Sequence, residues 1–188
     1  VLGVTVALVA FVMLRTVISA WEVGVDAAAK DRIGIRHKVS FVMSMPRRYV
    51  DVVRDHQRFP QIRQATWANW FGAKDPRHPD DFFATLAVDP TSFLEVYDEL
   101  SVPPAQRQAW LDDRQGALVG DVLARKLHVS VGDRITLQGS IVPGDFTFNI
   151  SGIYTATRRS FDRSTFLFHW DYMNQALPEE RRDQIGWI

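Results

Sequence analysis

Residues 116–139 read GALVGDVLARKLHVSVGDRITLQG, and this run has the most regular pattern from which the fold can be predicted. Val119, Leu123 and Leu127 recur every four residues, a spacing that lines one face of a helix. Asp121 lies early in the run, where a carboxylate suits the positive end of the helix dipole. We therefore expect a helix that carries Val119, Leu123 and Leu127 on one buried side.

Two turns and two strands follow this helix. Residues 131–133, Val-Gly-Asp, predict a tight turn into a strand over 134–138. A second turn at 143–145, Pro-Gly-Asp, precedes the run 146–151, where apolar Phe, Phe and Ile alternate with Thr, Asn and Ser. A period of two residues is typical of a strand with one buried face.

The remaining sequence extends this pattern in both directions, and together the elements indicate an α+β domain with a mostly antiparallel or mixed sheet. Trp67, Trp70, Trp110 and Trp170 are expected in its core, because each can bury a large apolar area. The further elements expected are a half-buried strand over 37–45, a helix after Pro46 with Tyr49, Val52 and Val53 on its inner face, strands over 65–71 and 82–88, a helix over 92–100, a helix opened by Pro103 with Trp110 and Leu111 facing inward, a strand over 165–170, a helix over 171–177 and the start of a strand at 185–188.

Residues 1–14, VLGVTVALVAFVML, carry no charge. A signal peptide would have a basic stretch before such a run, and a buried helix usually keeps one polar stripe. A bilayer-spanning helix needs roughly 20 apolar residues. We therefore predict a transmembrane helix over 1–20, cut at its N-terminal end, with Arg15 and Trp21 at the membrane interface. A helical stalk over 21–36 and an extracytoplasmic domain over 37–188, incomplete at its C-terminal end, are expected to follow.

The whole-chain composition excludes several classes of function. The 22 Lys and Arg residues balance 22 Asp and Glu residues and are scattered among them, so no nucleic-acid partner is expected. The chain contains no Cys, which removes disulfides, thiolate metal sites and Cys nucleophiles. Lack of Cys is compatible with an oxidising compartment but is also common in cytosolic chains.

No motif for catalysis, cofactor binding or metal binding emerges. No two of the five histidines have the HExxH spacing of a zinc site, and we expect them at the surface or in interfaces. Residues 116–120 lack the Lys and Ser or Thr of a phosphate-binding loop. The adjacent pairs Asp80-Asp81 and Asp112-Asp113 point in different directions and are expected to be solvated loop and cap residues. We therefore predict no catalytic residue, no cofactor and no metal ligand, and a protein that is not an enzyme.

The run from 116 to 154 resembles the core domain of FtsX-like ABC transporter permeases of the MacB type. The matching phrases are Val119-Gly120-Asp121 with Ala124, the turn and strand VGDRITL at 131–137, and the strand FNISGI at 148–153. The order of a membrane helix, a stalk and a large domain also fits this family.

The resemblance implies a membrane-spanning permease subunit that dimerises with a second copy or a paralogue. It implies a separate cytoplasmic ABC ATPase chain, membrane lipid, and a periplasmic adaptor or carrier as partners. Its location would be the bacterial inner membrane, with the domain on the periplasmic side. In this family ATP binding below the membrane moves the stalks, and the outer domains export or extract a substrate.

A second class of protein remains open. A ligand-sensing ectodomain of a single-pass membrane receptor would also have an anchor, a helical stalk and an α/β domain. The two alternatives differ in the rest of the protein: a permease has further membrane helices, and a receptor has one membrane helix and a signalling module.

Overall fold

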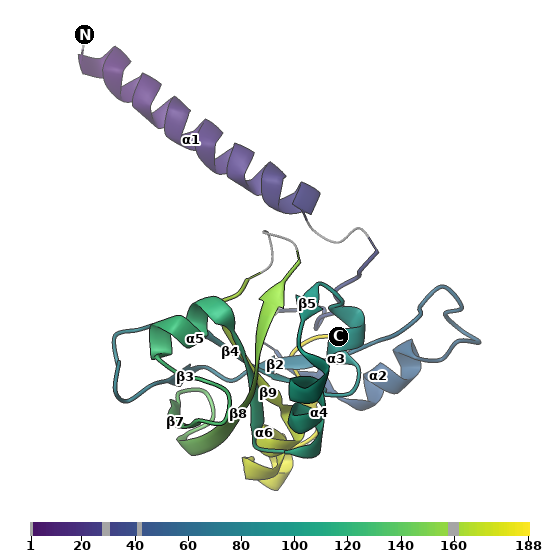
Figure 1. The fold of residues 1–188 in the computed structure, drawn as a ribbon. Coiled ribbons are helices and arrows are strands. Elements are labelled where there is room, and N and C mark those ends of the chain that lie inside the picture. Colours follow the sequence, from purple (N-terminus) through teal and green to yellow (C-terminus); the bar gives the residue numbers. More distant parts are fainter. Residues whose placement is uncertain (1, 28–30, 41–42, 158–161) are drawn as a thin grey trace. The chain divides into compact units, whose positions relative to one another are not determined.

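A computed structural model describes residues 2–27, 31–40, 43–157 and 162–188 of the chain. It divides into two compact units, Val1–Ile33 and Gly34–Ile188. Unit 1 contains one helix, and unit 2 contains the remaining helices and all strands found in the described residues (Figure 1).

Unit 1 is the helix α1, Leu2–Ala27. Apolar side chains from Val4 to Leu14 are half to two-thirds exposed and lie all around it. Among the residues that the structure describes, no helix is both long and apolar enough to cross a membrane. The expected stalk is helical as far as Ala27; residues 28–30 lie outside the described residues, and residues 31–35 are not helical.

Unit 2 is built on a mixed sheet, which confirms the expected α+β class. Along the sheet the strands run β2, β4, β9, β6, β8, β7 and β3, and β5 pairs with one end of β8. The pairs β4–β9 and β6–β8 are parallel, and the others are antiparallel. The strands are β2 Ala68–Trp70, β3 Ala73–Lys74, β4 Ala84–Val88, β5 Leu100–Ser101, β6 Gly116–Gly120, β7 Arg134–Gly139, β8 Gly144–Ala156 and β9 Thr165–His169.

Each face of this sheet carries its own apolar core. In β9, Phe166 and Phe168 pack into one core, while Leu167 between them packs into the other. Helices contribute to both: α5 and α6 bury side chains in the first core, and α3 and α4 in the second. The helices of unit 2 are α2 Arg48–Val53, α3 Phe93–Val96, α4 Pro104–Asp112, α5 Asp121–Leu127, α6 Trp170–Ala176 and the short 3-10 helix η1 Glu179–Arg181.

The helix expected to include Val119 begins later than predicted. Residues 116–120 form the strand β6, and the helix α5 starts at Asp121. All five residues of β6 are buried, because the strand has a core on each face. A short apolar run buried on both sides shows no alternation, so its periodicity does not distinguish it from a helix. Leu123 and Leu127 do lie on the buried face of α5.

The prediction for residues 37–45 is also corrected. Only Met45 and Pro46 form a strand, β1, and Val39 and Met43 are exposed; Phe41 lies outside the described residues. In α2 the buried side chain is Val50, while Tyr49 and Val52 remain about 45% and 43% exposed. The apolar residues of this region therefore do not all face the core, although their spacing suggested that they would.

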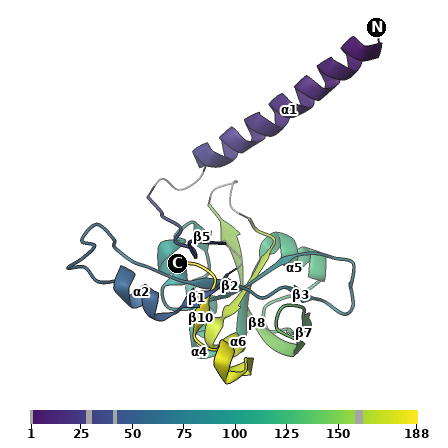
Figure 2. The ribbon, with the colours of Figure 1, turned by 180° about the vertical axis from the view of Figure 1, so that it is seen from behind.

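Most other predicted elements are found close to their expected places. The strands β4, β7, β8 and β9 and the helices α3, α4 and α6 overlap their predicted ranges. Trp67, Trp110 and Trp170 are buried as expected, but Trp70 on the edge strand β2 is half exposed and lies against Trp187. The residues expected to start a strand at 185 contribute to β10, Gln184–Ile185, which pairs with β1 (Figure 2).

Candidate functional site

The Gly-Asp phrase at 120–121 stands where β6 ends and α5 begins. The strands β8 and β9 pair with opposite edges of β6, and residues 162–164, which lead into β9, lie at the end of β6. The carbonyl oxygen of Arg163 would lie only 2.0 Å from a Cβ atom on Gly120. The same oxygen accepts a hydrogen bond from the backbone N–H of Leu123, at 3.3 Å. Only a glycine fits at position 120.

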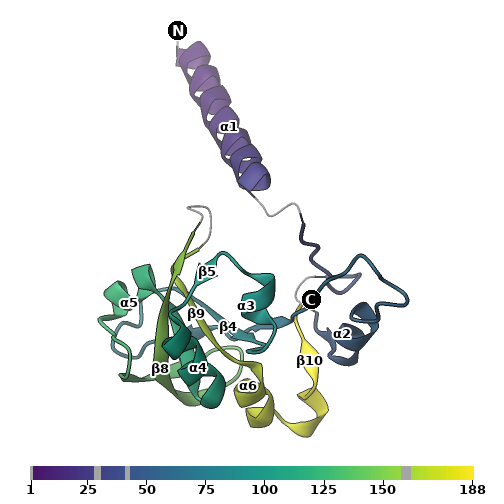
Figure 3. The ribbon, with the colours of Figure 1, turned by 45° about the vertical axis from the view of Figure 1, so that its right-hand side comes forward.

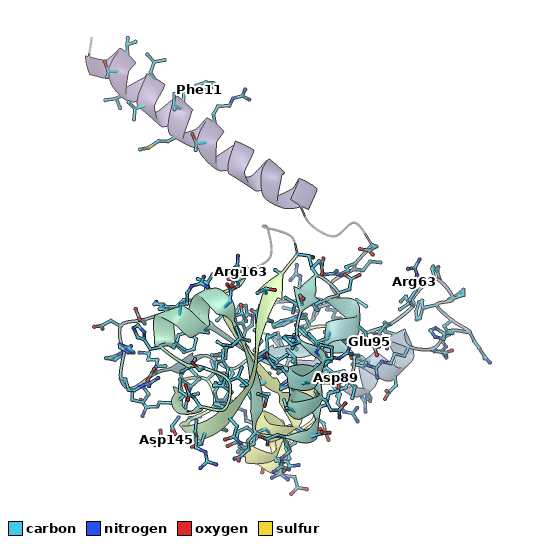
Figure 4. The ribbon with its side chains drawn as sticks, in the orientation of Figure 1. Phe11, Arg63, Asp89, Glu95, Asp145 and Arg163 are labelled. Carbon is cyan, nitrogen blue, oxygen red and sulfur yellow. The ribbon has the colours of Figure 1, made fainter. Side chains whose placement is uncertain are left out.

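Asp121 forms ion pairs that hold Arg163 at the end of β6. Its carboxylate accepts hydrogen bonds from Nε and Nη2 of Arg163, and from Nη1 of Arg125 at 2.9 Å. The hydrogen bonds from Arg163 lower the pKa of Asp121 to about 2; burial opposes this shift, and Arg125 adds to it. Figure 4 shows Arg163 at this end of the sheet, beside α5. A carboxylate bound by two guanidinium groups is suited to holding backbone in place.

The residues on both sides of Arg163 are also held by hydrogen bonds. The hydroxyl of Tyr154 in β8 lies 3.2 Å from the carbonyl oxygens of both Thr165 and Asp162 and shares its one hydrogen between them. The carboxylate of Asp162 accepts from the N–H of Ser164 and the hydroxyl of Thr165. Burial raises the pKa of Tyr154, which therefore stays protonated and able to donate.

The second Gly-Asp phrase, at 132–133, ties a turn to β8. Gly132 has a φ of +93°, a conformation that other residues rarely adopt. Its N–H donates to the carbonyl of Ile150 at 2.8 Å, and the N–H of Ile150 donates back to the carbonyl of Asp133 at 2.8 Å. Both Gly-Asp phrases, which are part of the family resemblance, therefore have structural roles in this chain.

The histidines and paired aspartates do not converge on a reactive centre. His169 is 5% exposed, contrary to the expectation of a surface position, and its Nε2 lies 2.8 Å from the carbonyl oxygen of Trp110. Burial lowers its pKa. Asp112 and Asp113 have separate partners, Gln108 and Asn149. In the described part of the chain, no three His, Cys, Asp or Glu side chains are grouped as a metal site would require.

Segments far apart in the sequence meet in what we call the long-range pairing: residues 35–36 and 45–47 against residues 183–188. Ile35 and Ile188 exchange two backbone hydrogen bonds, of 2.7 and 2.9 Å. Arg47 N–H donates to the carbonyl of Asp183 at 2.8 Å, and β1 pairs with β10 between these points.

The long-range pairing is in turn bonded to the edge of the main sheet. The N–H of Ala68 in β2 donates to the carbonyl of Trp187 at 3.1 Å, and Ala68 accepts from the N–H groups of Gly186 and Trp187. Residues 35–36 are therefore linked to β2 by backbone hydrogen bonds through residues 186–188. Sequence reasoning did not find this connection, because strands of two residues carry no periodicity.

Comparison with known proteins relates the chain by fold. No protein-family model and no curated protein sequence matches it. The structure is similar to a domain of a protein described as a permease from Porphyromonas gingivalis, with a TM-score of 0.53, 19% sequence identity, and coverage of 81% of this chain and 71% of that one. It is also similar to the extracellular domain of the noncanonic ABC-type transporter YknZ from Gram-positive bacteria, with a TM-score of 0.48, 10% identity, and coverage of 77% and 71%. The chain thus shares the fold of the permease domain from P. gingivalis.

Proposed function

We propose that this chain belongs to the permease subunit of an ABC transporter of the MacB/FtsX/lipoprotein-release type. The observation that carries the proposal is the shared fold with the permease domain from P. gingivalis, to which the sequence phrases at 119–124, 131–137 and 148–153 add support. In this proposal α1 is part of a membrane helix, and unit 2 lies on the extracytoplasmic side of the bacterial inner membrane.

The chain's own residues suit a moving part better than a reaction centre. The charged and polar clusters described above hold backbone segments together, as Asp121 does for the β8–β9 connection. Hydrolysis of ATP would take place in a separate cytoplasmic chain. Motion of the membrane helix would then reach unit 2 at residues 35–36 and pass to β2 through the long-range pairing.

The test is purification of the intact membrane protein in detergent, with mass spectrometry of the proteins that co-purify. The proposal predicts a stoichiometric ABC ATPase and two permease copies, identical or paralogous. A protein that purifies without an ATPase and carries a signalling module in its own chain would contradict the proposal and favour a ligand-sensing receptor.

A further inference from the structure

The charges of unit 2 are segregated along the chain. Residues 34–64 contain seven cations and two carboxylates, a net charge of +5. Residues 1–33 are balanced, so residues 65–188 carry the compensating −5. We call the described residues of this segment, 34–40 and 43–64, the basic lobe; its cations are Arg36, Lys38, Arg47, Arg48, Arg54, Arg58 and Arg63.

Apolar side chains are exposed in the same segment. Val39 is 70% exposed, and four more large apolar residues of the lobe remain at least 39% exposed. These four are Met43, Tyr49, Val52 and Phe59. Exposed cations interspersed with exposed apolar and aromatic side chains are typical of a surface that enters the interface of a membrane.

The lobe has a fixed base. The guanidinium of Arg54 donates to the carbonyl of Ala65, through Nε at 3.1 Å and Nη2 at 2.6 Å, and so closes the loop over residues 55–64. The same group bonds Asp89 and Ser92 and lies 5.4 Å from the ring centre of Trp67. Arg54 therefore fixes where the loop leaves unit 2.

The loop and α2 lie at one end of unit 2, and α5, β3 and β7 lie at the other (Figures 1 and 3). Arg63 extends from this loop in Figure 4, away from Asp89 and Glu95 at its base. Arg63 is thus presented on a projecting loop.

We infer that the basic lobe binds the surface of a membrane that contains anionic phospholipid. The inference rests on the proposed function, in which α1 is inserted in the bilayer. The membrane interface is expected at Trp21 and the lobe begins at residue 34, so the short segment between them leaves the lobe within reach of the membrane surface. Attraction to anionic headgroups acts over about 10 Å at ordinary ionic strength, and the apolar side chains add a contribution that salt does not screen.

An acidic polypeptide is the main competing partner for a cationic surface. It would pair with the exposed cations but would leave Val39 and Met43 without an apolar environment. A membrane interface accommodates both kinds of side chain, and this favours lipid.

The absence of Cys makes a site-specific test direct. The full chain carrying Gln57→Cys in the loop is labelled with a polarity-sensitive fluorophore and reconstituted in nanodiscs of phosphatidylcholine, with or without phosphatidylglycerol. A chain labelled at Ser140→Cys, in the turn between β7 and β8 at the other end of unit 2, is the control. We expect an emission shift for the probe at 57, only with phosphatidylglycerol, and none for the probe at 140.

Neutralisation of two exposed cations tests the role of charge. Arg48→Gln/Arg63→Gln should lower the ratio of lipid-bound to free lobe by about thirtyfold, which is about fivefold for each cation lost. Lys74→Gln/Arg181→Gln removes the same charge from the rest of unit 2 and should leave the ratio unchanged.

The outcomes separate this inference from the proposed function. If α1 is integrated, as judged by resistance to alkaline extraction, and the probe at 57 responds equally in both lipids, the lobe does not bind anionic lipid. A shift produced by added polyglutamate but not by phosphatidylglycerol would assign the lobe to an acidic polypeptide and overturn the inference. Failure of α1 to integrate would contradict the proposed function itself.

Discussion

At the scale of single residues, the most constrained position is Gly120. The carbonyl of Arg163 occupies the space that any side chain at 120 would need. The neighbouring Asp121 holds the same backbone through its ion pair with Arg163. The missing side chain at Gly120 and the ion pair of Asp121 thus both fix the backbone of Arg163 at the end of β6.

Replacing Gly120 with Ala should destabilise unit 2. The added Cβ would lie 2.0 Å from a backbone oxygen, so the backbone of Arg163 must move, and we expect a loss of at least about 2 kcal/mol of unfolding free energy. Urea denaturation of the two proteins measures it. Gly34→Ala, where a Cβ meets nothing within 4 Å, is the matched control. Equal losses in both variants would contradict the steric argument.

The ion pair of Asp121 predicts a dependence of stability on pH. Its pKa is about 2 in the folded protein, against an ordinary value of 3.8, so the folded state favours the carboxylate. The resulting stabilisation is complete above pH 3.8 and is lost as the pH falls through about 2. Asp121→Asn should therefore be less stable than the wild type at neutral pH, and the difference should shrink in acid.

The measurement is chemical denaturation at a series of pH values, with Asp145→Asn as the control. Asp145 is exposed and lies at the start of β8 (Figure 4). A difference between Asp121→Asn and the wild type that stays constant from neutral pH to pH 2 would exclude the ion pair as its source.

At the scale of elements, the loop over 55–64 depends on one side chain. Arg54 binds the carbonyl of Ala65, Asp89 and Ser92 together, and Asp89 is only 6% exposed. Arg54→Met would leave this carboxylate without its cation, at a cost of about 1–3 kcal/mol. We also expect faster amide hydrogen exchange over residues 55–64.

Arg58→Met is the control for this prediction. Arg58 pairs with Asp55, but its side chain is 69% exposed, and such surface pairs contribute about 1 kcal/mol or less. Hydrogen exchange that is accelerated equally in both variants would contradict a special role for Arg54.

The strength of the sequence predictions also varies by element. The strand β8 was predictable because Phe146, Phe148 and Ile150 alternate with polar residues. The strand β6 was not, because burial on both faces removes that alternation. The region of β1 and α2 was misjudged because Val39, Tyr49 and Val52 are apolar but exposed, which periodicity alone does not distinguish from a core face.

At the scale of the whole molecule, the net charge of zero conceals an uneven distribution of charge along the chain. The chain is neutral, yet residues 34–64 are strongly basic and residues 65–188 acidic. A count over separate windows of the sequence would have found the basic lobe. The partner of Asp121 was not predictable in this way, because Arg163 lies 42 residues away and the contact depends on the order of strands in the sheet.

The proposed location of unit 2 gives a prediction for intact cells. A Ser140→Cys variant of the intact protein should react with a membrane-impermeant maleimide once the outer barrier is opened, without lysis of the inner membrane. Reaction only after lysis would place unit 2 on the cytoplasmic side. A folded domain of this length can be translocated whatever its charge, so the basic lobe does not oppose the predicted orientation.

In the proposed function, ATP hydrolysis in a separate chain moves unit 2, and a distance measurement between two copies tests this motion. The Cys-free chain allows one spin label per permease copy, at Ser140→Cys, in the purified transporter. Pulsed electron paramagnetic resonance then gives the distance between the labels in the nucleotide-free state and in the state trapped with ATP and vanadate. We expect two different distance distributions. A single unchanged distribution in a transporter that hydrolyses ATP would contradict it.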